Sequence, residues 1–352
     1  MKKVQIFFDE PSHIYSDNEG NVYTSATQLI GQYTPEYPAE FWAAYRALDQ
    51  YGHRLRPDPD NGRIYVGHYT GAPADWGNEE FKPYTIEQIV NGAVPMNWTK
   101  EQIMAEWQDI TDKACEIGNE KHNYLEDCVN KFYGAKKEAS DWNPDKYHDK
   151  LGFKVKIASI KELENSPLKV SHPDIYQLLA KFINDGWILY AEKRVYSYEH
   201  KISGMIDILA VKHGAFYIID WKTNKDELKF RSGYYKKEWR TDTYGNRIEK
   251  VKTDKWVSTK ELMLRPLRMP HSKGNVYKLQ LSLYAYLCEL WGMTHKGNIL
   301  VHIRHNDGVE LKPTIYYPKT MTYYKKEMAK LFKWHKARIE GKASNYRGAV
   351  AS

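Results

Sequence analysis

Two aspartates and a lysine near the middle of the chain have the side chains needed to hold a metal ion and to activate a water molecule. They lie in the stretch from Gly204 to Lys222, which reads GMIDILAVKHGAFYIIDWK. Side chains alternate along a strand, so Asp220 and Lys222 are expected on one face and Trp221 on the other. Oxygen ligands favour Mg²⁺ or Mn²⁺, and a lysine beside such a metal can orient or deprotonate water. These residue types suit metal-assisted hydrolysis of a phosphodiester bond.

A β-hairpin is the element that must bring the two aspartates together. Branched and aromatic residues in Met205–Val211 and Ala215–Ile219 predict two strands, and His213-Gly214 between them suits a two-residue turn with positive φ. Counting outward from this turn places Asp207 opposite Asp220, with Cβ atoms roughly 4.5–5.5 Å apart. The alternative for an Asp-x-Lys sequence at a strand end is a surface ion pair, which contributes little to stability. The opposed carboxylates favour a metal site, because they repel each other unless a cation lies between them.

The same residues carry a resemblance to a known family. Gly204-Met-Ile-Asp207 and Ile219-Asp220-Trp221-Lys222-Thr223 resemble the signature of the PD-(D/E)XK nuclease superfamily. The branch that they resemble most is that of the RecB-like exonucleases, which includes phage enzymes and mitochondrial genome maintenance exonuclease. The resemblance implies a restriction-endonuclease-like αβββαβ core, an α/β fold in which a central mixed sheet is flanked by helices.

Two further motifs that are similar to this branch lie on predicted helices. Gly118-x-x-x-His122-x-x-Leu125-Glu126 resembles its first motif, whose histidine joins the metal shell, although a lone histidine on a helix is more often structural. Gln280-x-x-x-Tyr284 resembles its fourth motif, whose residues contact the substrate backbone or order the active site. Their spacing of four places Gln280 and Tyr284 on the same side of a helix.

The resemblance implies a role for each of these residues. Asp207, Asp220 and His122, with the carbonyl of Trp221, would hold Mg²⁺ or Mn²⁺. Lys222 would position the attacking water. The residues expected to contact DNA in this part of the chain are Thr223, Gln280 and Tyr284.

Glu192 lies in the strand predicted over Trp187–Tyr198. If Glu199-His200 forms the next turn, Glu192 lies opposite Asp207 and becomes a third catalytic carboxylate. That turn contains neither Gly nor Asn. The alternative is a surface ion pair between Glu192 and Lys193.

The longest predicted helix begins after Thr99, and Gln102 completes a capping box there. Apolar residues recur along it at steps of three and four, which predicts a continuous core face formed by Ile103, Trp107, Ile110, Ala114, Ile117, Tyr124 and Cys128. A second helix is expected over Val276–Trp291 and a strand over Asn298–Arg304. With the three preceding strands, these elements give the order helix, three strands, helix, strand.

The chain is expected to divide near residue 98. Residues 1–98 would form an N-terminal extension with short strands and a helix over Phe41–Leu48. A long loop from Gln50 to Pro95 follows, in which only Thr85–Val90 looks regular, and a loop of that length is usually a functional lid or an insertion. Residues 99–352 would form the nuclease domain.

The three cysteines include no Cys-x-x-Cys pair, which argues against a zinc ribbon or an iron–sulfur cluster. This is a departure from those RecB-like relatives that carry a four-cysteine cluster. The expected state of Cys115, Cys128 and Cys288 is that of small buried thiols in a reducing compartment.

The positive charge of the chain lies in one segment. The formal net charge is +7, and residues 225–273 contain 14 Lys and Arg against 7 Asp and Glu. Within this basic insertion, Tyr234–Thr241 and Arg247–Lys252 predict a second hairpin. Aromatic rings beside cations suit an unpaired nucleic-acid strand, and the residues expected to bind it are Lys236, Lys237, Trp239 and Arg240. The alternative is a solvated charged hairpin.

The expected function is that of a metal-dependent DNA exonuclease that acts on single-stranded DNA or DNA ends, in phage-type replication, recombination or repair. A structure-specific endonuclease on the same core and a non-catalytic nucleic-acid-binding protein are the alternatives. The sequence has no apolar run that could span a membrane and no signal-peptide core, so a cytoplasmic location without a membrane partner is expected. It has no Walker-type phosphate loop, which argues against ATPase activity.

Overall fold

The computed structural model describes residues 4, 6–9, 12, 14–69, 79–96, 98–130, 155–243, 247–306 and 309–342. The chain forms two compact units, a larger one of Met1–Pro35 with Glu120–Ser352 and a smaller one of Glu36–Asn119. These limits differ from the division expected near residue 98, because the N-terminal strands pair with the sheet of the larger unit. None of the helices in the described ranges is long and apolar enough to cross a membrane.

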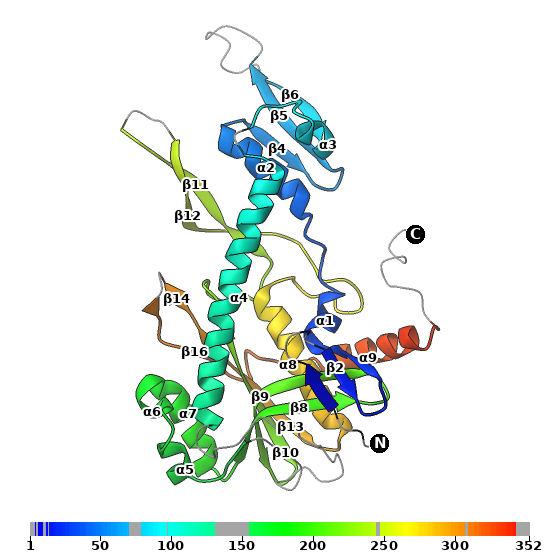
Figure 1. Cartoon of the computed structure of the whole chain (residues 1–352), viewed down its shortest axis with the longest axis vertical. Coiled ribbons are helices and arrows are strands. Elements are labelled where there is room, and N and C mark those ends of the chain that lie inside the picture. The colour runs from blue at the N-terminus through cyan, green and yellow to red at the C-terminus, as the bar shows by residue number, and fades with distance from the viewer. Residues whose placement is uncertain are drawn as a thin grey trace. The chain divides into compact units, whose positions relative to one another are not determined.

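A mixed sheet forms the centre of the larger unit (Figure 1). In the described part of the chain it has nine strands. Seven of them follow in the order β1 (Ile6–Asp9), β2 (Ile14–Asp17), β3 (Val22–Ser25), β9 (Ile202–Lys212), β10 (Ala215–Thr223), β13 (Thr294–Ile303) and β16 (Thr314–Tyr316). In addition, β8 (Ile188–Ser197) pairs with β9, and β7 (Val155–Ile157) pairs with β8. The β10–β13 and β3–β9 pairs are parallel and the other pairs are antiparallel.

Helices cover both faces of this sheet because its central strands are apolar on both sides. Phe216 and Ile218 of β10 belong to one core, together with residues of α1 (Ala26–Gly31), α8 (Lys273–Leu290) and α9 (Lys325–Ile339). Ile219 and Trp221 of the same strand belong to the opposite core. The helices of that core are the C-terminal part of α4 (Lys100–Asn130), α5 (Ile160–Glu164), α6 (Leu168–Ser171) and α7 (Pro173–Asn184). The α/β arrangement of a central mixed sheet flanked by helices is therefore as expected.

The hairpin of β9 and β10 has the predicted register. Lys212 pairs with Ala215, and the ladder continues to Ile208 and Ile219. The turn residues His213 and Gly214 have φ values of 46° and 75°. Positive φ at both positions is typical of the tight turns that match the twist of two antiparallel strands.

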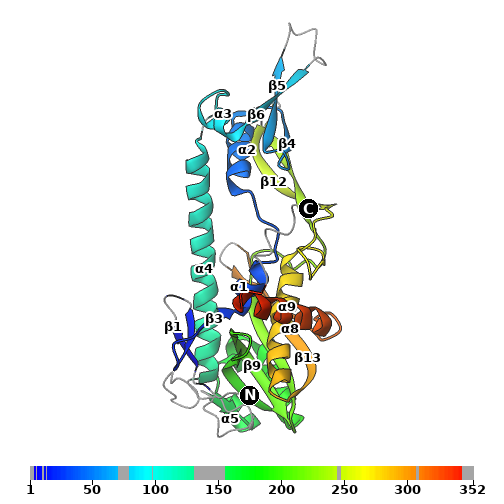
Figure 2. The same cartoon turned by 90° about the vertical axis from the view of Figure 1, so that its right-hand side faces the viewer.

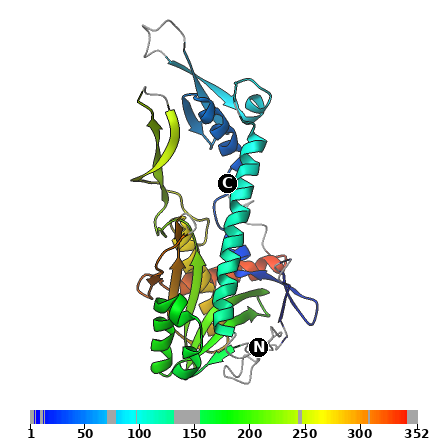
Figure 3. The same ribbon diagram turned by 60° about the vertical axis from the view of Figure 1, so that its left-hand side comes forward.

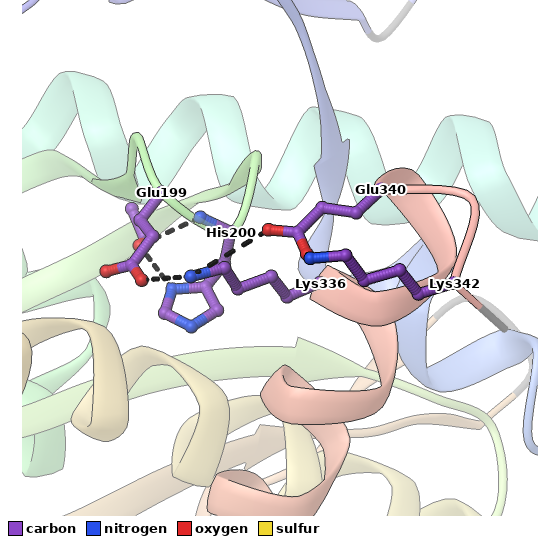
Figure 4. A network of polar contacts seen from close by, with 6 residues as sticks. Glu199, His200, Lys336, Glu340 and Lys342 are labelled. Carbon is purple, nitrogen blue, oxygen red and sulfur yellow. Dashed lines mark hydrogen bonds and ion pairs between the residues drawn. The ribbon is translucent and has the colours of Figure 1, made fainter.

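The turn between β8 and β9 is held against the C-terminal helix. Lys336 of α9 forms an ion pair with Glu199 in this turn and lies 3.9 Å from Glu340. Lys342 in turn lies 2.8 Å from Glu340, and Figure 4 shows this chain of contacts beside His200. The contact with Lys336 lowers the pKa of the Glu199 carboxyl. These exposed pairs contribute little energy individually, but they connect α9 to the end of the sheet.

The smaller unit shows that the prediction of a long loop from Gln50 to Pro95 was wrong (Figure 2). After α2 (Ala39–Tyr51), the strands β4 (Leu55–Asp58), β5 (Arg63–Tyr69) and β6 (Glu79–Thr85) form an antiparallel sheet, followed by α3 (Ile86–Val90). Ile64 and Val66 alternate into a core with Phe41 and Leu48. This apolar signal is only two residues long and is surrounded by Gly, Pro and Asp, which explains why it escaped recognition.

The long helix α4 begins as predicted but does not have one continuous core face. Thr99 and Gln102 form the expected capping box, with N···O distances of 2.8 and 3.2 Å. Ile103 is buried in a cluster of the smaller unit, and Cys128 is buried in the core of the larger one. Between them, Ile110 is 55% and Ile117 is 48% exposed. The helical period therefore continues through a stretch that packs in neither core.

The remaining strands lie after the β9–β10 hairpin in the sequence. The predicted basic hairpin is formed by β11 (Gly233–Thr241) and β12 (Arg247–Ser258), which Figure 3 shows as a two-stranded ribbon in yellow-green. β13 pairs with β16, and the short pair β14 (His305–Asn306) and β15 (Val309–Glu310) lies between them in the sequence.

Cys128 and Cys288 are buried, whereas Cys115 is exposed, so the expectation of buried thiols was wrong for Cys115.

Candidate active site

The two aspartates lie where β10 separates from β9. The last residues paired between these strands are Ile208 and Ile219. Asp207 precedes Ile208 on β9 and Asp220 follows Ile219 on β10, so both aspartates lie just beyond the end of the ladder. Oδ2 of Asp207 accepts a hydrogen bond from the backbone N–H of Trp221 at 2.8 Å. The Asp207 carboxylate therefore accepts the hydrogen bond of a backbone N–H at the point where the β9–β10 ladder ends.

Lys222 is the cation nearest to Asp220. Its Nζ lies 2.6 Å from Oδ2 of Asp220, and the two side chains are 16% and 1% exposed. Lys222 is thus the charge partner of this buried oxygen, which has no other polar contact in the described structure. As predicted, Asp220 and Lys222 alternate with Trp221, whose side chain packs in the core on the other face of the sheet.

Burial decides the electrostatics of these three groups. It raises the pKa of Asp207 and of Asp220 to about 6, against the smaller lowering effect of Lys222. Burial also disfavours the charged form of Lys222, but Asp220 and Asp207 outweigh it and the pKa of Lys222 is raised overall. Near neutral pH the site thus holds two anions and one ammonium, with one negative charge in excess.

His122 of α4 lies near the two aspartates. Its Nδ1 lies 4.0 Å from Oδ1 of Asp207, and the ring lies near the backbone of Trp221. Burial, followed by the charge of Lys222, lowers the pKa of His122 to about 4. The imidazole is therefore neutral at physiological pH, which is the form that binds metal ions.

Glu126 lies one helical turn beyond His122 and is also buried. Its charge raises the pKa of both Asp207 and His122, so it lies close to both. Sequence reasoning did not include this glutamate among the site residues. The available signals were its place at the end of the motif Gly118-x-x-x-His122-x-x-Leu125-Glu126 and its spacing of four from His122, which places both side chains on one side of α4.

The donors fit a hard divalent cation. Two buried carboxylates, a neutral imidazole and the backbone of Trp221 lie near one another, and Mg²⁺ and Mn²⁺ prefer oxygen ligands. The observation in favour is Oδ2 of Asp220, a buried anionic oxygen whose polar contact within the described residues is with Lys222 alone, so it keeps a lone pair for a cation. Among those residues, no three side chains of His, Cys, Asp and Glu have the arrangement of a complete metal site.

Helix α8 contributes a tyrosine and a glutamine. Nε2 of Gln280 donates a hydrogen bond to the hydroxyl of Tyr284 at 2.8 Å, so the predicted pair lies on one side of the helix. Burial, followed by the charge of Asp220, raises the pKa of Tyr284, which is therefore a neutral phenol near the carboxylates. The ring lies against Gly204 so closely that a Cβ there would come within 3.0 Å of it.

Glu192 has the predicted register on β8. Ala191 pairs with Ile208 and Lys193 with Ile206, so Glu192 occupies the position across from Asp207. The ladder omits this position because Glu192 has a φ of 50°, an uncommon backbone conformation for a residue other than Gly. The alternative of a surface ion pair was wrong, because Lys193 is only 1% exposed.

Beyond Lys222, β10 ends at Thr223 and the chain turns toward α8. Nδ2 of Asn224 donates a hydrogen bond to the hydroxyl of Tyr277 at 3.0 Å, and Nζ of Lys222 lies 5.7 Å from the centre of the Tyr277 ring. Sequence reasoning missed Tyr277. It lies three residues before Gln280, which was the only available signal.

The expected DNA-binding residues of the basic insertion lie together on β11. Lys236 and Lys237 are exposed, and Lys236 lies 3.2 Å from Glu238. Trp239 and Arg240 pair with Lys250 and Glu249 of β12. The structure thus brings together His122, Asp207, Asp220, Trp221 and Lys222, surrounds them with Glu192, Gln280 and Tyr284, and places the basic residues on a separate ribbon.

Comparison of the chain with models of known protein families, with curated proteins and with solved structures found no match.

Proposed function

We propose that the protein is a metal-dependent deoxyribonuclease of the PD-(D/E)XK type, and that it acts as an exonuclease on single-stranded DNA or on DNA ends. The observation that carries this proposal is the convergence of Asp207, Asp220, Lys222 and neutral His122 at the point where β9 and β10 separate. A structural role does not account for burying two like charges beside each other, since such burial destabilises the fold.

The order of elements supports the same proposal. α4, β8, β9, β10, α8 and β13 follow one another in the order of an αβββαβ core. β10 and β13 are parallel, and the three strands β8, β9 and β10 are antiparallel neighbours. The candidate residues lie on these elements, apart from those of the basic ribbon.

Each residue has a chemical role in this proposal. Asp207, Asp220, His122 and the Trp221 carbonyl would hold Mg²⁺ or Mn²⁺, which supplies a Lewis acid for the phosphate and lowers the pKa of water. Lys222 is held as an ammonium by the two carboxylates, so it can donate hydrogen bonds that orient water or stabilise negative charge on the phosphate. Tyr284, a neutral phenol hydrogen-bonded to Gln280, can donate to a phosphate oxygen.

An endonuclease on the same core is the second enzymatic candidate, and a non-catalytic nucleic-acid-binding protein is the candidate from another class. The buried carboxylates disfavour the latter, because anions repel a nucleic-acid backbone unless a cation lies between them. The basic ribbon is compatible with all three candidates.

The deciding experiment is digestion of linear and circular single-stranded DNA of the same sequence in Mg²⁺, in Mn²⁺ and with a chelator. An exonuclease degrades only the linear form and loses activity in the chelator. Lys222→Ala should be inactive, whereas Lys296→Ala, an exposed lysine at the opposite end of the sheet, should behave like the wild type. Cleavage of the circle would show an endonuclease, and binding of both forms without cleavage in either metal would refute the proposal.

A further inference from the structure

A pocket of about 410 Å³ lies at the base of the basic hairpin. It is formed by the segment that follows β10, by the start of β11, by part of β12 and by the N-terminal end of α8. Its volume falls in the range of roughly 300–1,000 Å³ that is usual for sites of small ligands. None of the residues proposed above to hold the metal lines it.

The lining carries an excess of positive charge. Lys229 pairs with Glu227 and Lys252 pairs with Asp226, each at 2.5 Å, so these four charges cancel. The other cations of the lining are Lys225, Arg231, Lys237 and Lys273. None of these four forms an ion pair with a carboxylate within the described residues, so they are available to an anion.

Tyr234, Tyr235 and Trp256 are the tyrosine and tryptophan residues that line the same pocket. Tyr235 and Trp256 pack edge to face with their centres 5.0 Å apart, and the guanidinium of Arg231 lies 5.1 Å from the centre of the Trp256 ring. Gly233 makes this packing possible, because a Cβ there would come within 3.0 Å of Trp256. An aromatic surface next to unpaired cations recognises a group that carries both a phosphate and a base.

The pocket is connected to the catalytic lysine by a short series of contacts. Nζ of Lys273 donates a hydrogen bond to Oδ1 of Asn224 at 3.1 Å, and Asn224 also bonds the hydroxyl of Tyr277. The Tyr277 ring in turn faces Lys222 at 5.7 Å. Asn224 itself lines the pocket, only two residues after Lys222.

We propose that this pocket holds one nucleotide of the bound strand, adjacent to the nucleotide whose phosphate is cleaved. Arg231 and Lys237 bind its phosphate, and Lys225 and Lys273 add positive charge around it. The edges of Tyr235 and Trp256 contact its base. The position next to the cleaved phosphate rests on the proposed nuclease function, whereas nucleotide binding by the pocket does not.

Binding is measured by fluorescence anisotropy with a labelled oligothymidylate in a chelator, so that cleavage plays no part. The test protein carries Arg231→Ala and Lys237→Ala, and the matched control is Lys260→Ala, an exposed lysine of the same segment outside the pocket. The pocket variant should weaken binding and reduce the slope of log K against log salt by about 0.7 for each phosphate that the protein no longer neutralises. Unchanged affinity and slope in a folded variant would overturn the proposal.

Competition experiments distinguish a nucleotide from inorganic phosphate as the ligand of the pocket. Thymidine monophosphate should displace the oligonucleotide from the wild type at lower concentration than inorganic phosphate does, and this difference should disappear in the pocket variant. Equal displacement by inorganic phosphate would contradict a nucleotide site.

Photocrosslinking of an iodouracil-substituted strand should yield adducts on Tyr235 or Trp256. Adducts confined to other parts of the chain would also contradict a nucleotide site.

Failure of this inference is separable from failure of the proposed function. Lys222→Ala should bind the strand like the wild type without cleaving it. If the wild-type protein binds through the pocket but cleaves no DNA in Mg²⁺ or Mn²⁺, the nuclease proposal is refuted and the nucleotide pocket stands. If the wild-type protein cleaves DNA and the pocket variant binds the strand normally, the nucleotide pocket is refuted and the nuclease proposal stands.

Discussion

The ring of Tyr284 occupies the space that a side chain on Gly204 would need. A Cβ at Gly204 would lie within 3.0 Å of Cε1 of this ring. The glycine of the hairpin therefore sets how closely α8 approaches β9, and with it the position of the phenol beside Asp220.

The first prediction concerns this contact. Gly204→Ala should move the Tyr284 ring and destabilise the protein by about 1–3 kcal/mol, the usual effect of overpacking a core. Turnover should fall further than the reduced fraction of folded protein explains, which unfolding in urea and cleavage rates measured on the same preparation would show. Gly31→Ala is the control, because a Cβ there meets no atom within 4 Å. Equal activity in both variants would argue against a role for Tyr284.

Lys222 carries the second prediction. Lys222→Ala should reduce cleavage about 10²–10⁴-fold, the range for a group that assists proton transfer or orients water, and should leave DNA affinity within a few-fold. It also leaves two buried carboxylates without their cation, so the metal-free variant should be less stable near neutral pH. Wild-type turnover in this variant would exclude the assigned role.

The third prediction concerns the proposed metal ligands. Asp207→Asn and Asp220→Asn each replace an anionic oxygen with a neutral one, so each should weaken Mn²⁺ binding at least tenfold by calorimetry, since even indirect partners of metal ligands cost about 10–100-fold. His122→Ala should lose activity in Mg²⁺, with partial recovery in Mn²⁺. Asp185→Asn, an exposed aspartate at the end of α7, is the control. Unchanged Mn²⁺ binding by Asp207→Asn would place the metal elsewhere.

The fourth prediction is a pH dependence of the metal-free protein. The pKa values of Asp207 and Asp220 are raised from 3.8 to about 6, so their contribution to stability is complete below pH 3.8 and is lost as pH rises through 6. The pKa of His122 is lowered from 6.5 to about 4, so its contribution is complete above pH 6.5 and is lost as pH falls through 4. Two carboxylates outweigh one imidazole, so these groups together should make stability fall between pH 4 and 6.

This linkage can be measured in two ways. The free energy of unfolding of wild type minus that of the Asp207→Asn, Asp220→Asn double variant should fall with rising pH in this window. Calorimetric titration with Mn²⁺ at pH 5.5, in two buffers of different ionisation enthalpy, should show proton release that disappears above pH 7.5. A difference in unfolding free energy that does not vary with pH would contradict the burial argument.

The β9–β10 hairpin could be predicted from the sequence because two independent local signals agree there. The His213-Gly214 turn and the alternation of apolar residues both set the same register, and counting along two strands is reliable once the turn is known. Glu192 could be assigned its position by the same count, but its positive φ could not be foreseen, since the strand pattern continues through it.

Elements that depend on distant contacts were not predictable in the same way. The apolar stripe of α4 continues through Ile110 and Ile117, which are exposed, because a helical period does not reveal where one core ends and another begins. The strands β4 to β6 have too few apolar residues to stand out from a loop. Tyr277 belongs to the site only because tertiary packing brings α8 to it.

The turn at His213-Gly214 has a consequence for how this protein can change in evolution. It lies at the opposite end of the β9–β10 ladder from the carboxylates. A single inserted or deleted residue there would nevertheless exchange the faces of Asp220 and Trp221, because side chains alternate along β10. The connection of the basic ribbon between Thr241 and Arg247 is under a weaker constraint, since the register of β11 and β12 positions none of the residues proposed to hold the metal. Among descendants of this sequence, changes in length should therefore accumulate at that end of the ribbon and be absent from the short turn.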